Sequence, residues 1–175
     1  MARMFRTLTA DEIEVKVKQV KPNGLVVLLY KTARTDMDLL DEAVGPGNWE
    51  NDYREIKGNL YAGIGIRQAD GRMVWKWDCG VESREDGEGN EKKGEASDSF
   101  KRAGFRWGIG RELYTSPFIW IPSAKCEIEN GKCYDKFSVE AIAYDDSGKI
   151  RALAIRNDTQ AQKLGKNVRA FVWQA

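Results

Sequence analysis

Apolar residues near the N-terminus recur at helical spacing. Thr9 and Glu12 stand three residues apart and make a capping-box sequence at the start of the segment. The apolar positions that follow are Ile13, Val17 and Val20. This spacing predicts a first helix that ends at the Lys-Pro-Asn-Gly sequence of residues 21–24. The short apolar run over 25–30 then predicts a buried strand.

A second amphipathic segment lies between residues 35 and 47. Thr35 is predicted as the N-cap, and the acids in the first turn suit the positive end of a helix dipole. The apolar face consists of Leu39, Leu40 and Ala43. The Gly-Pro-Gly sequence at 45–47 ends this helix.

Three segments with alternating apolar and polar residues follow, and they predict an antiparallel β-meander. The segments are residues 49–56, 59–67 and 72–79. Turn sequences, Lys-Gly-Asn and then Asp-Gly, separate them. Trp75 and Trp77 share a face that we expect in the core, whereas Tyr61 and Arg67 are expected on the opposite side, toward solvent.

A charged, glycine-rich stretch over 82–95 predicts a surface loop, and an amphipathic helix is predicted after it over 95–108. This helix would cover the apolar face of the meander. The elements predicted beyond Pro122 are strands at 136–144 and 149–156, a helical turn at 159–165 and a last strand at 171–173. The predicted fold is therefore α+β, a β-meander packed against a long amphipathic helix (a β-β-β-α core), in one domain over residues 1–175.

Composition places the chain among globular proteins and excludes catalytic sites that depend on histidine. Apolar residues make up 42% and charged residues 31% of the 175 residues. The absence of His removes Ser/His/Asp and Cys/His catalytic sites, and the 3 Cys lack CxxC spacing. We therefore expect no metal site, no cofactor and no disulfide. The apolar runs are too short for a signal peptide or a membrane span, so a cytoplasmic location is expected.

The net charge is only +1, so an anion-binding site has to come from local clustering of charge. The stretch GEASDSFKRAGFRWGIGR, residues 94–111, supplies such a cluster. On a helix, one side carries the apolar stripe of Phe100, Ala103, Gly104 and Trp107. Arg102 and Arg106 lie on the opposite side, flanked by Lys101 and Phe105.

Two interpretations of this basic stripe stay open. One is phosphate contact by the basic side chains, with Phe105 or Trp107 near the bases of a nucleic acid. The other is a solvated helix face whose arginines pair with loop acids, such as Glu85, Asp86 or Glu88.

The stretch KKGEASDSFKRAGFRWGIGRELY resembles the signature helix of the Rad-fifty-two family of single-strand annealing proteins, which includes phage proteins of the Sak type. The order of elements before it is also similar. An apolar strand precedes an acidic helix, DMDLLDEAVGPGNW, and a meander, GNLYAGIGIRQADGRMVWKWDCGVES. The resemblance covers about residues 25–115 and leaves 116–175 as an unassigned β-rich extension.

The resemblance implies a non-enzymatic protein, of phage or prophage origin, that anneals complementary strands in homologous recombination and DNA repair. It implies subunits that assemble into a ring or a helical filament, with a basic groove that holds single-stranded DNA. The DNA contacts that it implies are Lys101 and Arg102 on the signature helix, and Lys31 and Arg34 near the start of the acidic helix. The resemblance does not imply Arg106 and Phe105; helical spacing places Arg106 on the basic stripe and the aromatic Phe105 beside it.

The partners expected on this interpretation are single-stranded DNA and further copies of the chain, in the cytoplasm of a bacterial host. A phage exonuclease and a host single-strand binding protein are candidate protein partners, and no membrane is involved. The C-terminal tail with which eukaryotic members bind their protein partners is not expected in this chain.

Two other functions stay open. A single-strand binding protein of the OB type also combines a β-rich chain with aromatic and basic residues, although a helix after the meander fits its closely spaced strands poorly. The other function is that of a metal-dependent nuclease, which four carboxylates in the acidic helix suggest. These are Asp36, Asp38, Asp41 and Glu42, of which helical spacing sets Asp36 apart.

Overall fold

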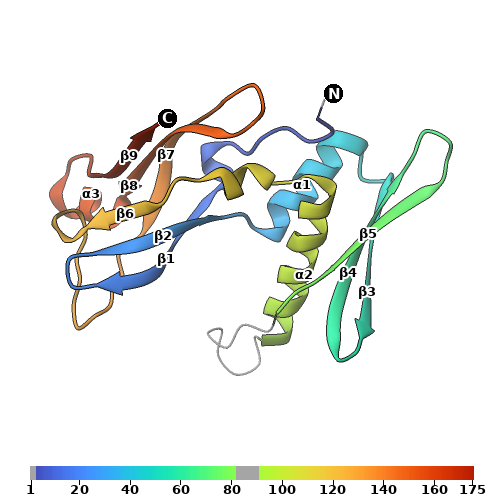
Figure 1. The fold of residues 1–175 in the computed structure, drawn as a ribbon, viewed down its shortest axis with the longest axis horizontal. Helices are drawn as coiled ribbons and strands as arrows, with labels where there is room; N and C mark the ends of the chain where they lie inside the picture. Colours follow the sequence, from blue (N-terminus) through green and yellow to red (C-terminus); the bar gives the residue numbers. More distant parts are fainter. Residues whose placement is uncertain (1–2, 82–90) are drawn as a thin grey trace. The chain divides into compact units, whose positions relative to one another are not determined.

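The computed structural model describes residues 3–81 and 91–175, and Figure 1 shows its elements. Within these residues it is an α+β fold with three α-helices and two antiparallel sheets, which confirms the predicted class. The chain divides into two compact units, which are described separately. The first unit contains Thr32–Gly110 and the N-terminal segment up to Arg6, and the second contains Thr7–Lys31 and Arg111–Ala175. Most of the predicted surface loop, residues 82–90, lies outside the described residues.

The first unit is built on a three-stranded antiparallel sheet. Its strands, in spatial order, are β3 (Trp49–Ile56), β4 (Asn59–Arg67) and β5 (Met73–Cys79). Lys57 and Gly58 have φ angles of 52° and 76°, as a tight two-residue hairpin turn requires. The central strand β4 supplies three side chains to the core. They are Ala62, Ile64 and Ile66, none more than 1% exposed.

Helix α2 (Glu91–Trp107) covers this core face and packs on β4 and β5. The apolar stripe of the helix is buried as predicted at Phe100 and Ala103. The Trp107 indole donates a hydrogen bond of 2.8 Å to the backbone oxygen of Ile64, which fixes the C-terminal end of the helix on the sheet.

Helix α1 (Ala33–Val44) packs against α2 and buries Leu39 and Leu40. The helix begins earlier than predicted, because the side chain that accepts the first backbone hydrogen bond belongs to Thr32 and not to Thr35. Gly45 ends the helix, as predicted.

The two tryptophans of β5 lie on the face that α2 does not cover. Lys76 and Asp78 are the β5 side chains that contact α2, and strand alternation sends Trp75 and Trp77 to the other face. The prediction that these tryptophans join the core is therefore wrong. Tyr61 and Arg67 face the same side as the indoles, because they pair across the sheet with Cys79 and Met73.

The second unit is built on a six-stranded antiparallel sheet in the order β6-β2-β1-β7-β8-β9. The strands are β1 (Glu14–Lys21), β2 (Gly24–Tyr30), β6 (Ile119–Pro122), β7 (Phe137–Tyr144), β8 (Ile150–Asn157) and β9 (Arg169–Gln174). The two edge strands, β6 and β9, also approach each other, so the sheet is strongly curled. The strands predicted after residue 135 are all present. Short 3-10 turns lie at Ala10–Glu12, Arg111–Thr115 and Ser123–Lys125.

The first predicted helix is wrong, because β1 occupies most of its length. The Thr9 capping box forms, but it starts only a 3-10 turn. From Glu14 to Lys18 the residues alternate between charged side chains and β-branched valine, a pattern typical of a half-buried strand. The turn after Lys21 then returns the chain as β2, which pairs with β1.

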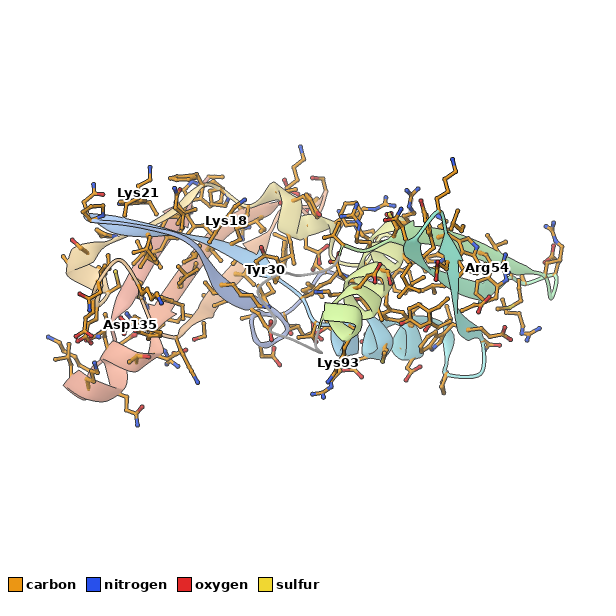
Figure 2. The ribbon with its side chains drawn as sticks, turned by 90° about the horizontal axis from the view of Figure 1, so that it is seen from below. Lys18, Lys21, Tyr30, Arg54, Lys93 and Asp135 are labelled. Atoms are coloured by element: carbon orange, nitrogen blue, oxygen red, sulfur yellow. The ribbon has the colours of Figure 1, made fainter. Side chains whose placement is uncertain are left out.

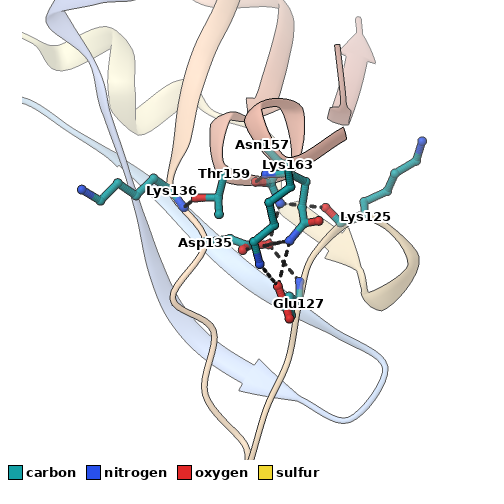
Figure 3. A network of polar contacts seen from close by, with 8 residues as sticks. Lys125, Glu127, Asp135, Lys136, Asn157, Thr159 and Lys163 are labelled. Carbon is teal, nitrogen blue, oxygen red and sulfur yellow. Dashed lines mark hydrogen bonds and ion pairs between the residues drawn. The ribbon is translucent and has the colours of Figure 1, made fainter. Parts of the chain in front are cut away.

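A polar network fixes the last helix, α3 (Asp158–Leu164), to the second unit (Figure 3). The buried Asn157 amide donates to the Asp135 carboxylate at 2.7 Å and to the Lys125 backbone oxygen at 2.9 Å. The Asn157 side-chain oxygen accepts the Gln160 backbone N–H at 3.0 Å and so caps the helix.

Candidate nucleic-acid interface

The C-terminal half of α2 brings two arginines to one carboxylate of β5. The Nε atom of Arg106 lies 3.0 Å from the Oδ2 of Asp78, and the Nε atom of Arg102 lies 3.7 Å from the Oδ1 of Asp78. Asp78 reaches them because α2 packs on its face of the sheet. The Asp78 side chain is 16% exposed, whereas those of Arg102 and Arg106 are 51% and 56% exposed.

Lys76, two residues before Asp78 on the same strand, adds a third cation. Its ammonium donates a 3.3 Å hydrogen bond to the backbone oxygen of Arg106. It also lies 4.4 Å from the centre of the Trp107 ring, within the range of a cation–π contact. We call Lys76, Arg102 and Arg106, with Asp78 between them, the α2–β5 basic cluster.

The α2–β5 basic cluster has more positive charge and more hydrogen-bond donors than its carboxylate can take up. Three cations and one anion leave a net charge of +2. Each guanidinium carries five N–H donors, and a carboxylate offers about four acceptor positions. The two arginines are half-exposed although Asp78 is not, so a phosphate can reach them from solvent and compete with Asp78 for their donors.

The other predicted DNA-binding residues lie in different settings. Lys101 and Phe105 are half-buried on α2, and each already has an interaction within the protein. Arg34 is exposed in the first turn of α1. Lys31 is only 8% exposed, has an interaction of its own, and belongs to the second unit.

Sequence reasoning missed Lys76 and Asp78. The segment around them predicts a strand with one tryptophan face in the core, which leaves the side of Lys76 and Asp78 for solvent. The loop acids proposed as partners, Glu85, Asp86 and Glu88, lie outside the described residues, and the partner found is Asp78. The signal that could have identified it is the spacing of Lys76 and Asp78, opposite in charge and on one face of the strand before the basic helix.

A second concentration of positive charge lies on β1 in the second unit (Figure 2). Lys16, Lys18 and Lys21 are all exposed along this strand. The ammonium of Lys16 lies 5.4 Å from the ring centre of the exposed Tyr30, and Glu14 is 3.7 Å away. This row places an aromatic ring beside lysines, a combination that also suits a nucleic-acid strand.

Three of the four acidic residues of α1 lie in separate settings. Asp36 is completely buried, Asp41 accepts the Trp49 indole N–H at 2.7 Å, and Glu42 forms an ion pair of 3.0 Å with Arg6. Over residues 3–81 and 91–175, no group of three or more His, Cys, Asp or Glu side chains is arranged to hold a metal ion.

Among the helices of the described chain, none is both long and apolar enough to span a membrane. In comparisons with known proteins, no family model, no curated protein and no solved structure matches this chain.

Proposed function

We propose that this protein binds single-stranded DNA without sequence preference and promotes the annealing of complementary strands. The observation that carries the proposal is the α2–β5 basic cluster, in which Arg102 and Arg106 share the single carboxylate of Asp78 and Lys76 binds the backbone oxygen of Arg106. Half-exposed guanidinium groups are suited to phosphate, which they can hold through two parallel hydrogen bonds.

Contacts between arginine and phosphate hold the DNA backbone and do not involve the base edges. Phosphate contacts give affinity without sequence information, and that affinity falls with salt because bound counterions are released. An annealing protein needs this behaviour, since each strand has to be gripped while its bases remain able to pair. Pairing itself is downhill, so the proposed activity requires neither a nucleotide nor a metal ion.

The order of elements in the first unit supports the same function through the resemblance to the Rad-fifty-two family. A three-stranded antiparallel sheet is followed in sequence by a 17-residue helix that carries the basic stripe. On this interpretation the first unit is the β-β-β-α core of an annealing subunit. Copies of it would assemble side by side into a ring or filament that acts in phage recombination and repair.

The experiment that tests the proposal measures annealing of two complementary fluorescent oligonucleotides, without ATP and with EDTA present. Purified protein is expected to accelerate annealing over the protein-free rate, most strongly at low salt. Absence of acceleration despite tight strand binding would contradict annealing. Absence of any strand binding would contradict the whole proposal.

A protective single-strand binding protein is a second candidate, and the second unit favours it. Its six-stranded antiparallel sheet is curled so that edge strands β6 and β9 approach, a shape closer to the barrels that bind single strands. A hairpin-forming oligonucleotide separates the two functions. A protective protein opens the hairpin and slows annealing, whereas an annealing protein speeds pairing with a complementary strand.

A further inference from the structure

The sheet of the first unit has a second face, opposite α2, that carries aromatic side chains. Trp75 and Trp77 of β5 lie on this face, and Tyr61 of β4 joins them from across the sheet. Figure 2 shows Arg54 on the neighbouring strand β3, where it contributes a cation to the same face. We call Trp75, Trp77, Tyr61 and Arg54 the indole face.

The two indoles are stacked on each other and lie flat over glycine. Their ring centres are 5.6 Å apart and their planes differ by 23°. Trp77 lies over Gly63 and Trp75 over Gly65, so closely that a Cβ atom on either glycine would come within 2.6 Å of a ring atom. These glycines therefore let both rings lie along the sheet, where each indole stays partly exposed.

Arginine and tyrosine border the stacked rings. The Arg54 guanidinium lies 4.4 Å from the centre of the Trp77 ring, and its Nε is 3.3 Å from the Asp52 carboxylate. Arg67 is exposed near the far end of β4. The hydrogen-bonded thiol of Cys79 raises the pKa of the Tyr61 hydroxyl, so the phenol stays uncharged near neutral pH and does not repel a phosphate.

The size of the indole face limits what can occupy it. Seven residues at about 3.3 Å and three strands at about 4.8 Å give roughly 23 by 14 Å, or about 300 Å². A stable interface between protein copies needs about 800 Å² on each side, so this face alone is too small to hold a second copy. Two or three flat rings fit it well. Its two arginines, Arg54 and Arg67, are matched in charge by Glu50 and Asp52 of β3 on the same face, so the aromatic rings are what the face offers a ligand.

We propose that the indole face binds the bases of single-stranded nucleic acid by stacking on Trp75 and Trp77. This inference rests on the proposed single-strand binding, to which it adds a base contact separate from the phosphate contacts of the α2–β5 basic cluster. Every base has a flat π surface, so stacking adds affinity without reading sequence. The face would hold a few bases of a strand whose remaining bases stay available for pairing.

The test compares two strands of equal length and charge, an oligothymidylate and its abasic counterpart, which lacks bases. Replacement of both rings, Trp75→Leu with Trp77→Leu, is expected to weaken oligothymidylate binding at least about tenfold. Binding of the abasic strand should stay within about twofold. Trp173→Leu, on β9 of the second unit, is the matched control and should leave both affinities unchanged.

The outcomes separate this inference from the proposed function. Wild-type protein that binds neither strand overturns the proposed function. Wild-type protein that binds both strands equally, or a double variant that retains oligothymidylate affinity, overturns the stacking inference alone. An equal loss for both strands together with a change in oligomer size also overturns it, because the face would then be a contact between subunits.

A second measurement does not depend on the folding of the leucine variant. An oligothymidylate that carries 5-iodouracil is bound to the wild-type protein and irradiated, and the cross-linked peptide is then sequenced. Stacking predicts a cross-link within residues 73–79 or at Tyr61. Efficient cross-linking that maps only elsewhere in the chain would contradict the inference.

Discussion

Arg106 of α2 and Asp78 of β5 form an ion pair of 3.0 Å that holds the C-terminal end of the helix against the sheet. Because Asp78 is the one anion of the α2–β5 basic cluster, it opposes a bound phosphate. Asp78→Asn removes this charge, and the amide oxygen can keep the hydrogen bond from the Cys79 backbone N–H. We expect single-strand affinity at low salt to rise about fivefold or more, since one charge about 4 Å away is worth about 1 kcal/mol even when it is fully screened by water.

Fluorescence anisotropy of a labelled oligothymidylate measures this change. Asp70→Asn is the matched control, because Asp70 also pairs with an arginine, Arg72, but in the exposed turn between β4 and β5. The control should bind like the wild type. A fall in affinity on Asp78→Asn would mean that Asp78 serves mainly to position the arginines, which would contradict competition between carboxylate and phosphate.

The two arginines of the cluster set the predicted salt dependence. Arg102→Ala with Arg106→Ala should lower affinity at low salt and reduce the slope of log K against log salt by about 1.4, or 0.7 for each lost contact with a single strand. The binding titration is repeated between low and moderate salt. Arg151→Ala with Lys166→Ala, two exposed cations of the second unit, is the charge-matched control. Equal slopes for both double variants would exclude the cluster as the phosphate site.

Gly104 of α2 is predicted to be required for the close packing of α1. A Cβ atom at Gly104 would lie 2.5 Å from the Oδ1 of the buried Asp36. Gly104→Ala should therefore lower the free energy of unfolding by about 1–3 kcal/mol through overpacking, even though alanine favours a helix. Urea unfolding followed by circular dichroism measures the loss. Gly47→Ala, where no atom lies within 4 Å of the added Cβ, should change stability little, and equal effects would refute the packing argument.

The sequence predicts the strands of the first unit well, because their turn residues and alternation are local signals. It fails at β1, where Ile13, Val17 and Val20 fit helical spacing and a register shift between Val17 and Gln19 interrupts the alternation of the strand. The residue that separates helix from strand is Val15, which pairs with Leu29 and extends the alternation that a helix would break. Pairing with β2 decides the outcome, and such pairing is a long-range contact that spacing alone cannot reveal.

The candidate site was predictable only on its helix side. Helical spacing places Arg102 and Arg106 together, four residues apart, without any tertiary information. Their partner Asp78 depends on which face of β5 the helix covers, and alternation offers two faces without choosing between them. The wide rings of Trp75 and Trp77 suggest a core, yet they cover glycines of the neighbouring strand on the outer face.

The ion pair between Glu127 and Lys163 makes the attachment of α3 sensitive to pH. The Lys163 ammonium, and then the Gln160 amide, lower the pKa of the Glu127 carboxyl, and Glu127 in turn raises the pKa of Lys163. The stabilisation from Glu127 is fully present above its unfolded pKa of about 4.3 and is lost as the pH falls through the lower folded value. The stabilisation from Lys163 is fully present below its unfolded pKa of about 10.4 and is lost as the pH rises through the higher folded value.

Lys163→Met should therefore lower the melting temperature by a small, constant amount, about 1–3 °C, from pH 5 to pH 9. The difference from the wild type should vanish as the pH falls below the folded pKa of Glu127, because the protonated carboxyl no longer favours the ammonium. Thermal unfolding by circular dichroism across this range measures both effects. Lys166→Met is the control, since Lys166 is an exposed lysine three residues further on and should show no such pH dependence. A difference for Lys163→Met that persists at pH 2 would assign the effect to packing of the lysine stem instead of to the ion pair.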